Sequence, residues 1–123
     1  MSHCSFSVLD RQLLIVDTST GRVMWHGAPL GFPVEEVEPL PVGDRALVLL
    51  DYMSGPSGPF ENLICVTCGG DVSWRAQLPS TSGTEAYVSF EIQGDELIAH
   101  AWTGHRVVLD PATGFLRESK FTK

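Results

Sequence analysis

Cysteine and histidine are the residues of this chain whose spacing could support chemistry. Two residues separate Cys65 from Cys68, the spacing of a metal-binding or redox pair. Zinc needs four converging ligands, and the third thiol is Cys4, next to His3. A thioredoxin-like pair would begin a helix, and no helix is predicted after Cys68. We interpret Cys65 as a buried strand residue and Cys68 as a turn residue. A metal site using Cys4, Cys65 and Cys68 is the alternative.

The histidines offer no recognisable catalytic arrangement. His3, His26, His100 and His105 are scattered, and none adjoins a serine or cysteine in a nucleophile motif. The patterns GxSxG, HExxH and the Walker loop are absent from the sequence. His100 and His105 flank a predicted hairpin, but acid–base catalysis also needs a placed partner. The sequence therefore predicts a protein without enzymatic activity and without a cofactor. An enzyme that uses Cys65, Cys68 and nearby histidines is the alternative.

Length and charge limit the classes of partner. The chain has 123 residues, 43% of them hydrophobic, which predicts a single domain over residues 1–123. Its 15 acidic and 8 basic residues give a net charge of -7. Phosphate groups repel such a chain, so we expect no nucleic acid and no membrane as partner. A basic protein surface is the better electrostatic match, with simple solubility as the alternative reason for the charge.

Targeting signals and cysteine count bear on the compartment. The first residues do not form a basic segment followed by an apolar run, and no stretch approaches the ~18 apolar residues of a membrane span. We therefore expect a cytoplasmic protein. The three cysteines are an odd number, which argues against a full disulfide framework.

Alternation and turn signals predict about eleven short strands and no helix. Residues 84–93 alternate most clearly and place Ala86, Val88, Phe90 and Ile92 on one face. Residues 46–51 are nearly all apolar, which predicts a strand covered on both faces. Residues 34–40 are crowded by prolines and are interpreted as an edge strand. Many short strands with regular turns are typical of an all-β protein.

One phrase occurs three times, over residues 13–25, 62–77 and 106–117. Each copy has an apolar run, a turn with glycine and a second strand-like run, and the first two copies contain Trp25 and Trp74. A repeat of ~40–50 residues with four strands is typical of propeller blades. The sequence predicts an antiparallel meander of two to three propeller-like units, over residues 5–26, 34–77 and 84–121, with the first unit shortened.

The first and third phrases resemble the V-x-L-D-x-x-T-G-x-x-x-W phrase of quinoprotein-like, PQQ-type β-propeller repeats. The chain also resembles small stand-alone bacterial proteins of uncharacterised function that contain such repeats. This resemblance implies blades. Quinoprotein enzymes use many blades and a quinone cofactor with calcium, whereas this chain has fewer than three blades and no matching ligands. The enzymatic activity is therefore not carried over.

An incomplete propeller must cover the outer faces of its sheets. Propellers close with ~4–8 blades, and this chain has too few. The sheets could pack face to face as a sandwich within one chain. A second copy could instead cover them in a symmetric pair. We favour the homodimer because monomers seldom expose large apolar patches.

Two segments are predicted to contact a protein partner. The loop at residues 54–59, with Ser54, Pro56 and Pro59, is the longest hairpin connection. Glu35, Glu36 and Glu38 form an acidic cluster, for which a solvated strand face is the alternative interpretation. The sequence therefore predicts a non-catalytic interaction module. An immunity-type protein that neutralises a basic toxin is one concrete form of it.

The three tryptophans are interpreted as core residues. Trp25 and Trp74 stand at repeated strand positions, and Trp102 ends another predicted strand. Each indole can bury a large apolar area, which favours packing over a role as a ligand platform.

Overall fold

The computed structural model describes residues 4–41, 44–81 and 83–122, and this part of the chain is built almost wholly of strands. The predicted number of strands is confirmed. No helix among the described residues is long and apolar enough to cross a membrane. The elements are the strands β1 (Cys4–Leu9), β2 (Gln12–Asp17), β3 (Val23–Gly27), β4 (Val34–Pro39), β5 (Arg45–Leu50), β6 (Leu63–Thr67), β7 (Val72–Arg75), β8 (Tyr87–Gln93), β9 (Glu96–Ala101), β10 (His105–Leu109) and β11 (Leu116–Phe121), and the single-turn 3₁₀ helices η1 (Pro29–Gly31) and η2 (Tyr52–Ser54).

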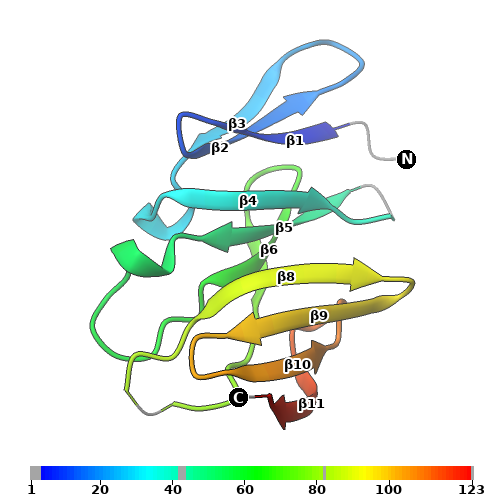
Figure 1. The fold of residues 1–123 in the computed structure, drawn as a ribbon. Coiled ribbons are helices and arrows are strands. Elements are labelled where there is room, and N and C mark those ends of the chain that lie inside the picture. The colour runs from blue at the N-terminus through cyan, green and yellow to red at the C-terminus, as the bar shows by residue number, and fades with distance from the viewer. Residues whose placement is uncertain (1–3, 42–43, 82, 123) are drawn as a thin grey trace.

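The strands form three antiparallel sheets in chain order. Sheet A has the order β1-β2-β3, sheet B β4-β5-β6-β7 and sheet C β8-β9-β10-β11. Within each sheet, every strand pairs with its neighbours in sequence, so the three predicted units and the shortened first unit are confirmed. The sheets lie on one another with sheet B in the middle, and they do not close into a ring (Figure 1). The structure is therefore a stack of propeller-like blades.

Sheet B is covered on both of its faces. Ala46, Val48 and Leu50 of β5 belong to the core against sheet A, and Leu47 and Leu49 belong to the core against sheet C. All five side chains are at most 3% exposed. Strand alternation sends successive side chains to opposite faces, so a strand in the middle layer needs apolar residues at every position. The prediction of a doubly covered strand is confirmed.

The predicted apolar face of β8 is interrupted by a bulge. The pairing of β8 with β9 shifts register between Tyr87 and Ser89. A bulge adds one residue to one strand and reverses the alternation beyond it. Tyr87 therefore joins Phe90 and Ile92 in the core between sheets B and C, whereas Ala86 packs in the core between sheets A and B. The expectation that Ala86, Val88, Phe90 and Ile92 share one face is wrong.

Tryptophan joins each of the first two sheets to the next. A Cβ added to Gly70 would lie 2.4 Å from Cγ of Trp25, and one added to Gly114 would lie 2.4 Å from Cε3 of Trp74. Both glycines have a positive φ, which the turn requires. Because they have no side chain, they also leave room for the tryptophan ring. The repeated phrase thus supplies the ring on one sheet and the glycine on the following sheet.

Asn62 links sheets B and C through main-chain groups. Its side chain is fully buried and donates to the carbonyl oxygens of Leu50, at 2.9 Å, and Tyr87, at 2.7 Å. Its Oδ1 accepts from the main-chain N–H of Tyr87 at 2.8 Å. A buried amide is stable only when such partners are present. This residue therefore fixes the start of β8 against the end of the loop that precedes β6.

A disulfide joins sheet A to the β6–β7 turn. Cys4 and Cys68 are bonded, with their Cα atoms 6.0 Å apart, and Cys65 is a buried free thiol. Of the three cysteines, two therefore form a bridge and the third is a core residue. The bridge was not predicted, because the two cysteines become neighbours only when the sheets stack.

Candidate functional site

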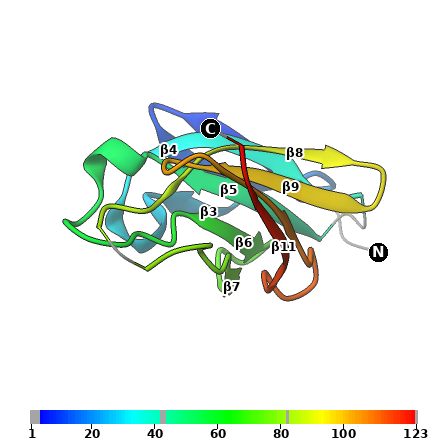
Figure 2. The same ribbon diagram turned by 60° about the horizontal axis from the view of Figure 1, so that its bottom comes forward.

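The predicted partner loop borders a cavity of about 370 Å³. We call it the aromatic site and define it by Tyr52, Met53, Pro56, Phe60, Thr84 and Trp102, which line it. Its residues come from η2 and the loop after it, from the segment before β8, and from the β9–β10 turn. In Figures 1 and 2 this loop lies at one side of the stack, opposite the β8–β9 turn.

Asp51 anchors the start of the loop. It is the N-cap of η2, where its carboxylate accepts from the main-chain N–H of Met53, at 2.9 Å, and from the hydroxyl of Ser54, at 3.1 Å. The Arg11 guanidinium also donates to it, at 2.5 Å. These bonds, with that from Arg11 foremost, lower the pKa of Asp51. The loop therefore begins from a fixed, charged cap.

Phe60 shapes the end of the same loop. Its ring packs on Phe32 with centroids 4.7 Å apart. A Cβ added to Gly55 would lie 2.2 Å from Cδ2 of Phe60, so only glycine fits at that position. The glycine and proline content that predicted a loop thus also lets the loop fold back over its own aromatic residue.

The opposite wall is held by Glu85 and Ala86. The Glu85 carbonyl accepts from the N–H of Phe60, and the Ala86 carbonyl accepts from that of Trp102, both at 2.8 Å. The fully buried Glu85 carboxylate accepts from the Thr103 hydroxyl at 2.6 Å and from its N–H at 3.3 Å. Two adjacent residues therefore fix both walls, and the cavity is largely preformed.

The side chains that face outward at this site are apolar. Met53 is 77% exposed and Trp102 is 52% exposed, and the Trp102 ring lies 5.5 Å from that of Tyr52, centroid to centroid. The interpretation of Trp102 as a core residue is wrong, because it follows the end of β9 and begins the β9–β10 turn, where its ring is exposed. For Trp74, which is 8% exposed, the core interpretation is confirmed, and Trp25 is partly buried against the core. Exposed tryptophan, tyrosine and methionine are enriched where proteins bind one another.

The loop residues singled out from sequence have different places. Pro56 lines the cavity, whereas Pro59 is not among the residues that line it. The Ser54 hydroxyl donates a hydrogen bond to Asp51, the cap of η2. The residues that sequence reasoning missed are Met53 and Trp102. Trp102 stands directly before a Thr-Gly turn signal, which could have indicated an exposed position.

The acidic cluster lies on β4, and one member reaches the base of the loop. Glu35, Glu36 and Glu38 are all exposed. Arg11 pairs with Glu35 at 3.4 Å as well as with Asp51, so one guanidinium joins the cluster to the cap of η2. Partial burial, together with the charges of Glu38 and Glu35, raises the pKa of Glu36. Glu36 and Glu38 form no ion pair within the described part of the chain.

The cysteines do not come together as one site. Cys65 lies in the core between sheets B and C, while the Cys4–Cys68 bridge packs against the core between sheets A and B. Burial raises the pKa of Cys65 to about 11, which keeps its thiol protonated and a poor ligand or nucleophile. Among residues 4–41, 44–81 and 83–122, no group of three or more histidine, cysteine or acidic side chains could hold a metal ion. His3 lies outside the described residues.

Of the two histidines near the β9–β10 turn, His105 has structural surroundings. The Thr103 hydroxyl lies 2.8 Å from Nδ1 of His105, whose ring packs on Phe121 at 5.3 Å between centroids.

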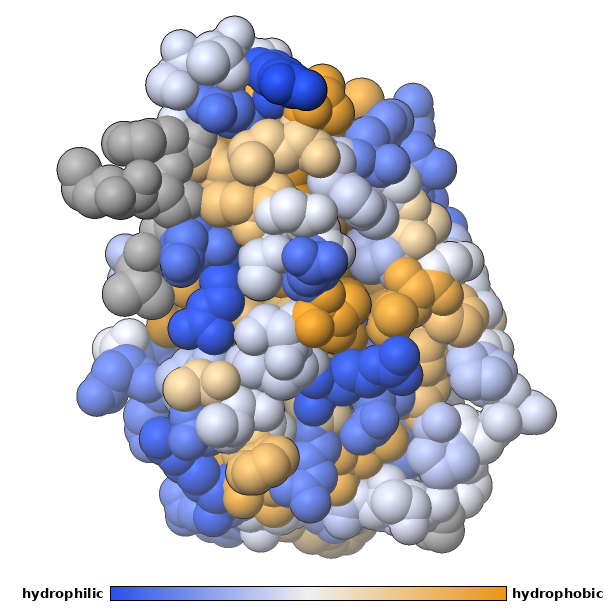
Figure 3. Space-filling model, turned by 180° about the vertical axis from the view of Figure 1, so that it is seen from behind, coloured by the Kyte–Doolittle hydropathy of each residue, from blue (hydrophilic) through white to orange (hydrophobic). Residues whose placement is uncertain are grey.

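The broad face opposite that of Figure 1 carries its apolar residues in small patches separated by polar ones (Figure 3). Among the described residues, that face therefore shows no single apolar surface to compete with the aromatic site.

Solved structures with similar folds include two designed proteins and a natural one. The computationally designed protein Ika8 has a TM-score of 0.62 and 14% identity, over 98% of this chain and 33% of that chain. The computationally designed protein Ika4 has a TM-score of 0.66 and 13% identity, over 100% of this chain and 69% of that chain. BamB from Moraxella catarrhalis, a β-propeller, has a TM-score of 0.57 and 18% identity, over 97% of this chain and 35% of that chain.

These similarities concern the fold alone. The chain spans about a third of Ika8 and of BamB. The propeller part of the expected resemblance is confirmed, whereas the family model that matches is not a quinoprotein one. No curated protein matches the sequence significantly. Residues 26–121 match the model described as "Domain of unknown function (DUF7957)", and the chain therefore belongs to that family.

Proposed function

We propose that this chain is a protein-interaction module that holds an apolar side chain of its partner in the aromatic site. The observation that carries the proposal is the exposure of Met53 and Trp102 beside Tyr52. Aromatic residues in such a position commonly dominate binding energy. The loop is capped by Asp51 and the walls are fixed by Glu85 and Ala86, so binding orders few groups and loses little entropy.

The partner in this proposal is a basic protein. Arg11 is shared between Glu35 and Asp51, which leaves Glu36 and Glu38 as the exposed carboxylates of β4 that it does not contact. Together with the net charge of -7, they favour approach of a positive surface. An immunity-type protein that neutralises a basic toxin is the concrete form that fits these features.

Photo-crosslinking tests the proposal directly. A photoreactive residue at Met53 should capture a specific partner, whereas the same residue at exposed Glu118, on sheet C, should not. Trp102→Ala should then weaken binding of the identified partner at least tenfold, equivalent to about 1.4 kcal/mol. Glu118→Ala is the matched control and should leave binding unchanged.

Two results would contradict this proposal. Equal affinity of the Trp102→Ala and wild-type chains would remove the aromatic site from the interface. An association rate that does not fall with added salt would remove the basic partner, because exposed charges are screened over ~8–10 Å at ordinary ionic strength.

The alternative function, a metal-dependent or enzymatic protein, draws on Cys65 and Cys68. The disulfide and the raised thiol pKa give it less support, since neither sulfur is available as a thiolate. Elemental analysis of the purified chain separates the two functions. We expect no stoichiometric zinc or iron, and finding either would favour the alternative.

A homodimer is also part of the proposal, and it would use the outer face of sheet A. Leu9, Val23 and Met24 are 48%, 55% and 44% exposed there. Gly21 is the counterpart of Gly70 and Gly114 in the repeated phrase, yet a Cβ added to it would meet no atom within 4 Å. Sheet A thus has the glycine side of the blade contact without a ring that covers it.

Sedimentation checks the assembly. At micromolar concentration we expect twice the chain mass of 13.4 kDa, and Met24→Glu should return the monomer mass. Phe115→Glu, at a residue 67% exposed and far from sheet A in sequence, is the control. A monomer mass over the whole concentration range would contradict the dimer.

A further inference from the structure

A second cavity lies between sheets B and C, at the side of the stack opposite the aromatic site. It has a volume of about 400 Å³ and is lined by described residues next to the end of β4 and at the start of β5, and by the β8–β9 and β10–β11 connections. Leu40, Ile92, Leu97 and Pro111 give it apolar walls, and Arg45, Asp95 and Glu96 give it charged ones. We call it the arginine site. Its volume lies within the range of ~300–1,000 Å³ that is usual for small-ligand sites.

Arg45 occupies a position where the fold otherwise places core residues. It is the first residue of β5 and alternates with Leu47 and Leu49, both of which belong to the core between sheets B and C. Arg45 is half-buried and forms no ion pair with any described residue. A guanidinium that lines a cavity and forms no ion pair with the carboxylates at its far end is suited to bind a ligand carboxylate, because its fork of donors matches carboxylate geometry.

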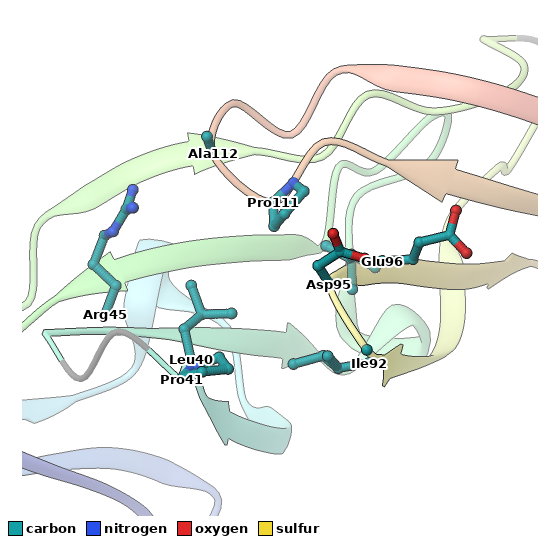
Figure 4. Close-up of a pocket in the computed structure, with 10 residues that line it drawn as sticks. Leu40, Pro41, Arg45, Ile92, Asp95, Glu96, Pro111 and Ala112 are labelled. Carbon is teal, nitrogen blue, oxygen red and sulfur yellow. The ribbon is translucent and has the colours of Figure 1, made fainter.

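Charges of opposite sign stand at the two ends of the site. Figure 4 shows the Arg45 side chain at one end and Asp95 and Glu96 at the other, with Leu40, Pro41 and Ile92 on one side and Pro111 on the other. Asp95 and Glu96 belong to the β8–β9 turn and are exposed. A purely anionic ligand would meet these carboxylates and the net charge of -7, so the favoured ligand carries both signs.

We infer that the arginine site binds a peptide C-terminus with an apolar last residue and a basic residue before it. The terminal carboxylate bonds to Arg45, the apolar side chain fills the space among Leu40, Ile92 and Pro111, and the basic group lies toward Asp95 and Glu96. The peptide is either a short free peptide or the end of a protein. This site shares no lining residue with the aromatic site, so peptide binding here does not depend on the proposed function.

The probe is the tetrapeptide Gly-Ala-Lys-Leu with a free carboxylate, titrated into the full ¹⁵N-labelled chain and followed by amide chemical shifts. Shifts should centre on residues 94–97 and Ala112, since Pro111 has no amide proton. Amidation of the peptide C-terminus should lower affinity at least tenfold, as should Arg45→Gln, because a charge-assisted bond is lost. The amidated peptide should bind wild-type and Arg45→Gln chains equally, since each change removes the same contact. Exchanging lysine for glutamate in the peptide should also weaken binding.

Amidation tests the central contact without altering the protein, so the test holds even if Arg45→Gln folds poorly. Trp102→Ala should bind the peptide like the wild type. The same four residues at the end of a carrier protein should bind equally if the natural ligand is a protein C-terminus, and weakly if it is a free peptide. Failure of both forms to bind, indifference to amidation, or shifts confined to the aromatic site would overturn the inference.

Discussion

Replacing Trp74 with alanine should lower the free energy of unfolding by about 3–5 kcal/mol, the usual result of removing a large aromatic side chain from a core. Trp74 is 8% exposed and belongs to the core between sheets B and C. Its ring covers Gly114, and its Nε1 donates to the carbonyl oxygen of Pro111 at 3.2 Å. The substitution therefore removes apolar contact and a hydrogen bond between two sheets at once.

Chemical denaturation measures this effect, and Trp102→Ala is its matched control. Trp102 is 52% exposed, so its removal should change stability by less than about 1 kcal/mol. The two substitutions should thus separate stability from binding, because only Trp102 lies in the aromatic site. A Trp74→Ala chain as stable as the wild type would show that the ring does not hold sheets B and C together.

The strands and their grouping could be predicted because they depend on local pattern. Alternation, turn residues and the repeated phrase determine where each strand begins and which strand pairs with it. The nearly continuous apolar run of β5 also revealed its place in the middle layer, since only a strand covered on both faces needs apolar residues throughout. These signals are contained in a few adjacent residues.

Contacts between the sheets could not be predicted in the same way. The bulge in β8 reverses the face of Ala86, yet residues 84–93 alternate without interruption in the sequence. Asn62 resembles any loop asparagine until Tyr87 of the next sheet supplies its partners. The contact of each tryptophan with the glycine of the following sheet depends on how the blades stack.

The candidate sites were predictable to different degrees. Glycine and proline indicated the loop of the aromatic site, but its exposed ring, Trp102, comes from another hairpin, some 40 residues further along the chain. The acidic cluster was identified, although only the fold reveals that Arg11 engages Glu35. Arg45 stands at the start of an apolar run. Only the register of β5 with β6 reveals that it lies on the face of β5 that packs against sheet C.

Loss of the Cys4–Cys68 disulfide should be the other large effect. The two cysteines are 64 positions apart, and closing a loop of that length stabilises a protein by about 4 kcal/mol in the chain-entropy description. Cys4 belongs to β1 and Cys68 follows β6, so the bridge also ties the shortened sheet A to sheet B. Sheet A has only three strands and one covered face, and it should loosen first when the bridge is cut.

Denaturation with and without a reductant checks this prediction, with Cys4→Ser and Cys65→Ala as paired variants. Reductant should destabilise the wild type and Cys65→Ala, because Cys65 takes no part in the bridge, and should leave Cys4→Ser unchanged. Equal stability in both conditions would contradict a structural role for the bond. Disulfides persist in oxidising compartments and are rare in the cytosol. The same measurement therefore bears on the predicted cytoplasmic location, where the chain would have to remain folded with Cys4 and Cys68 reduced.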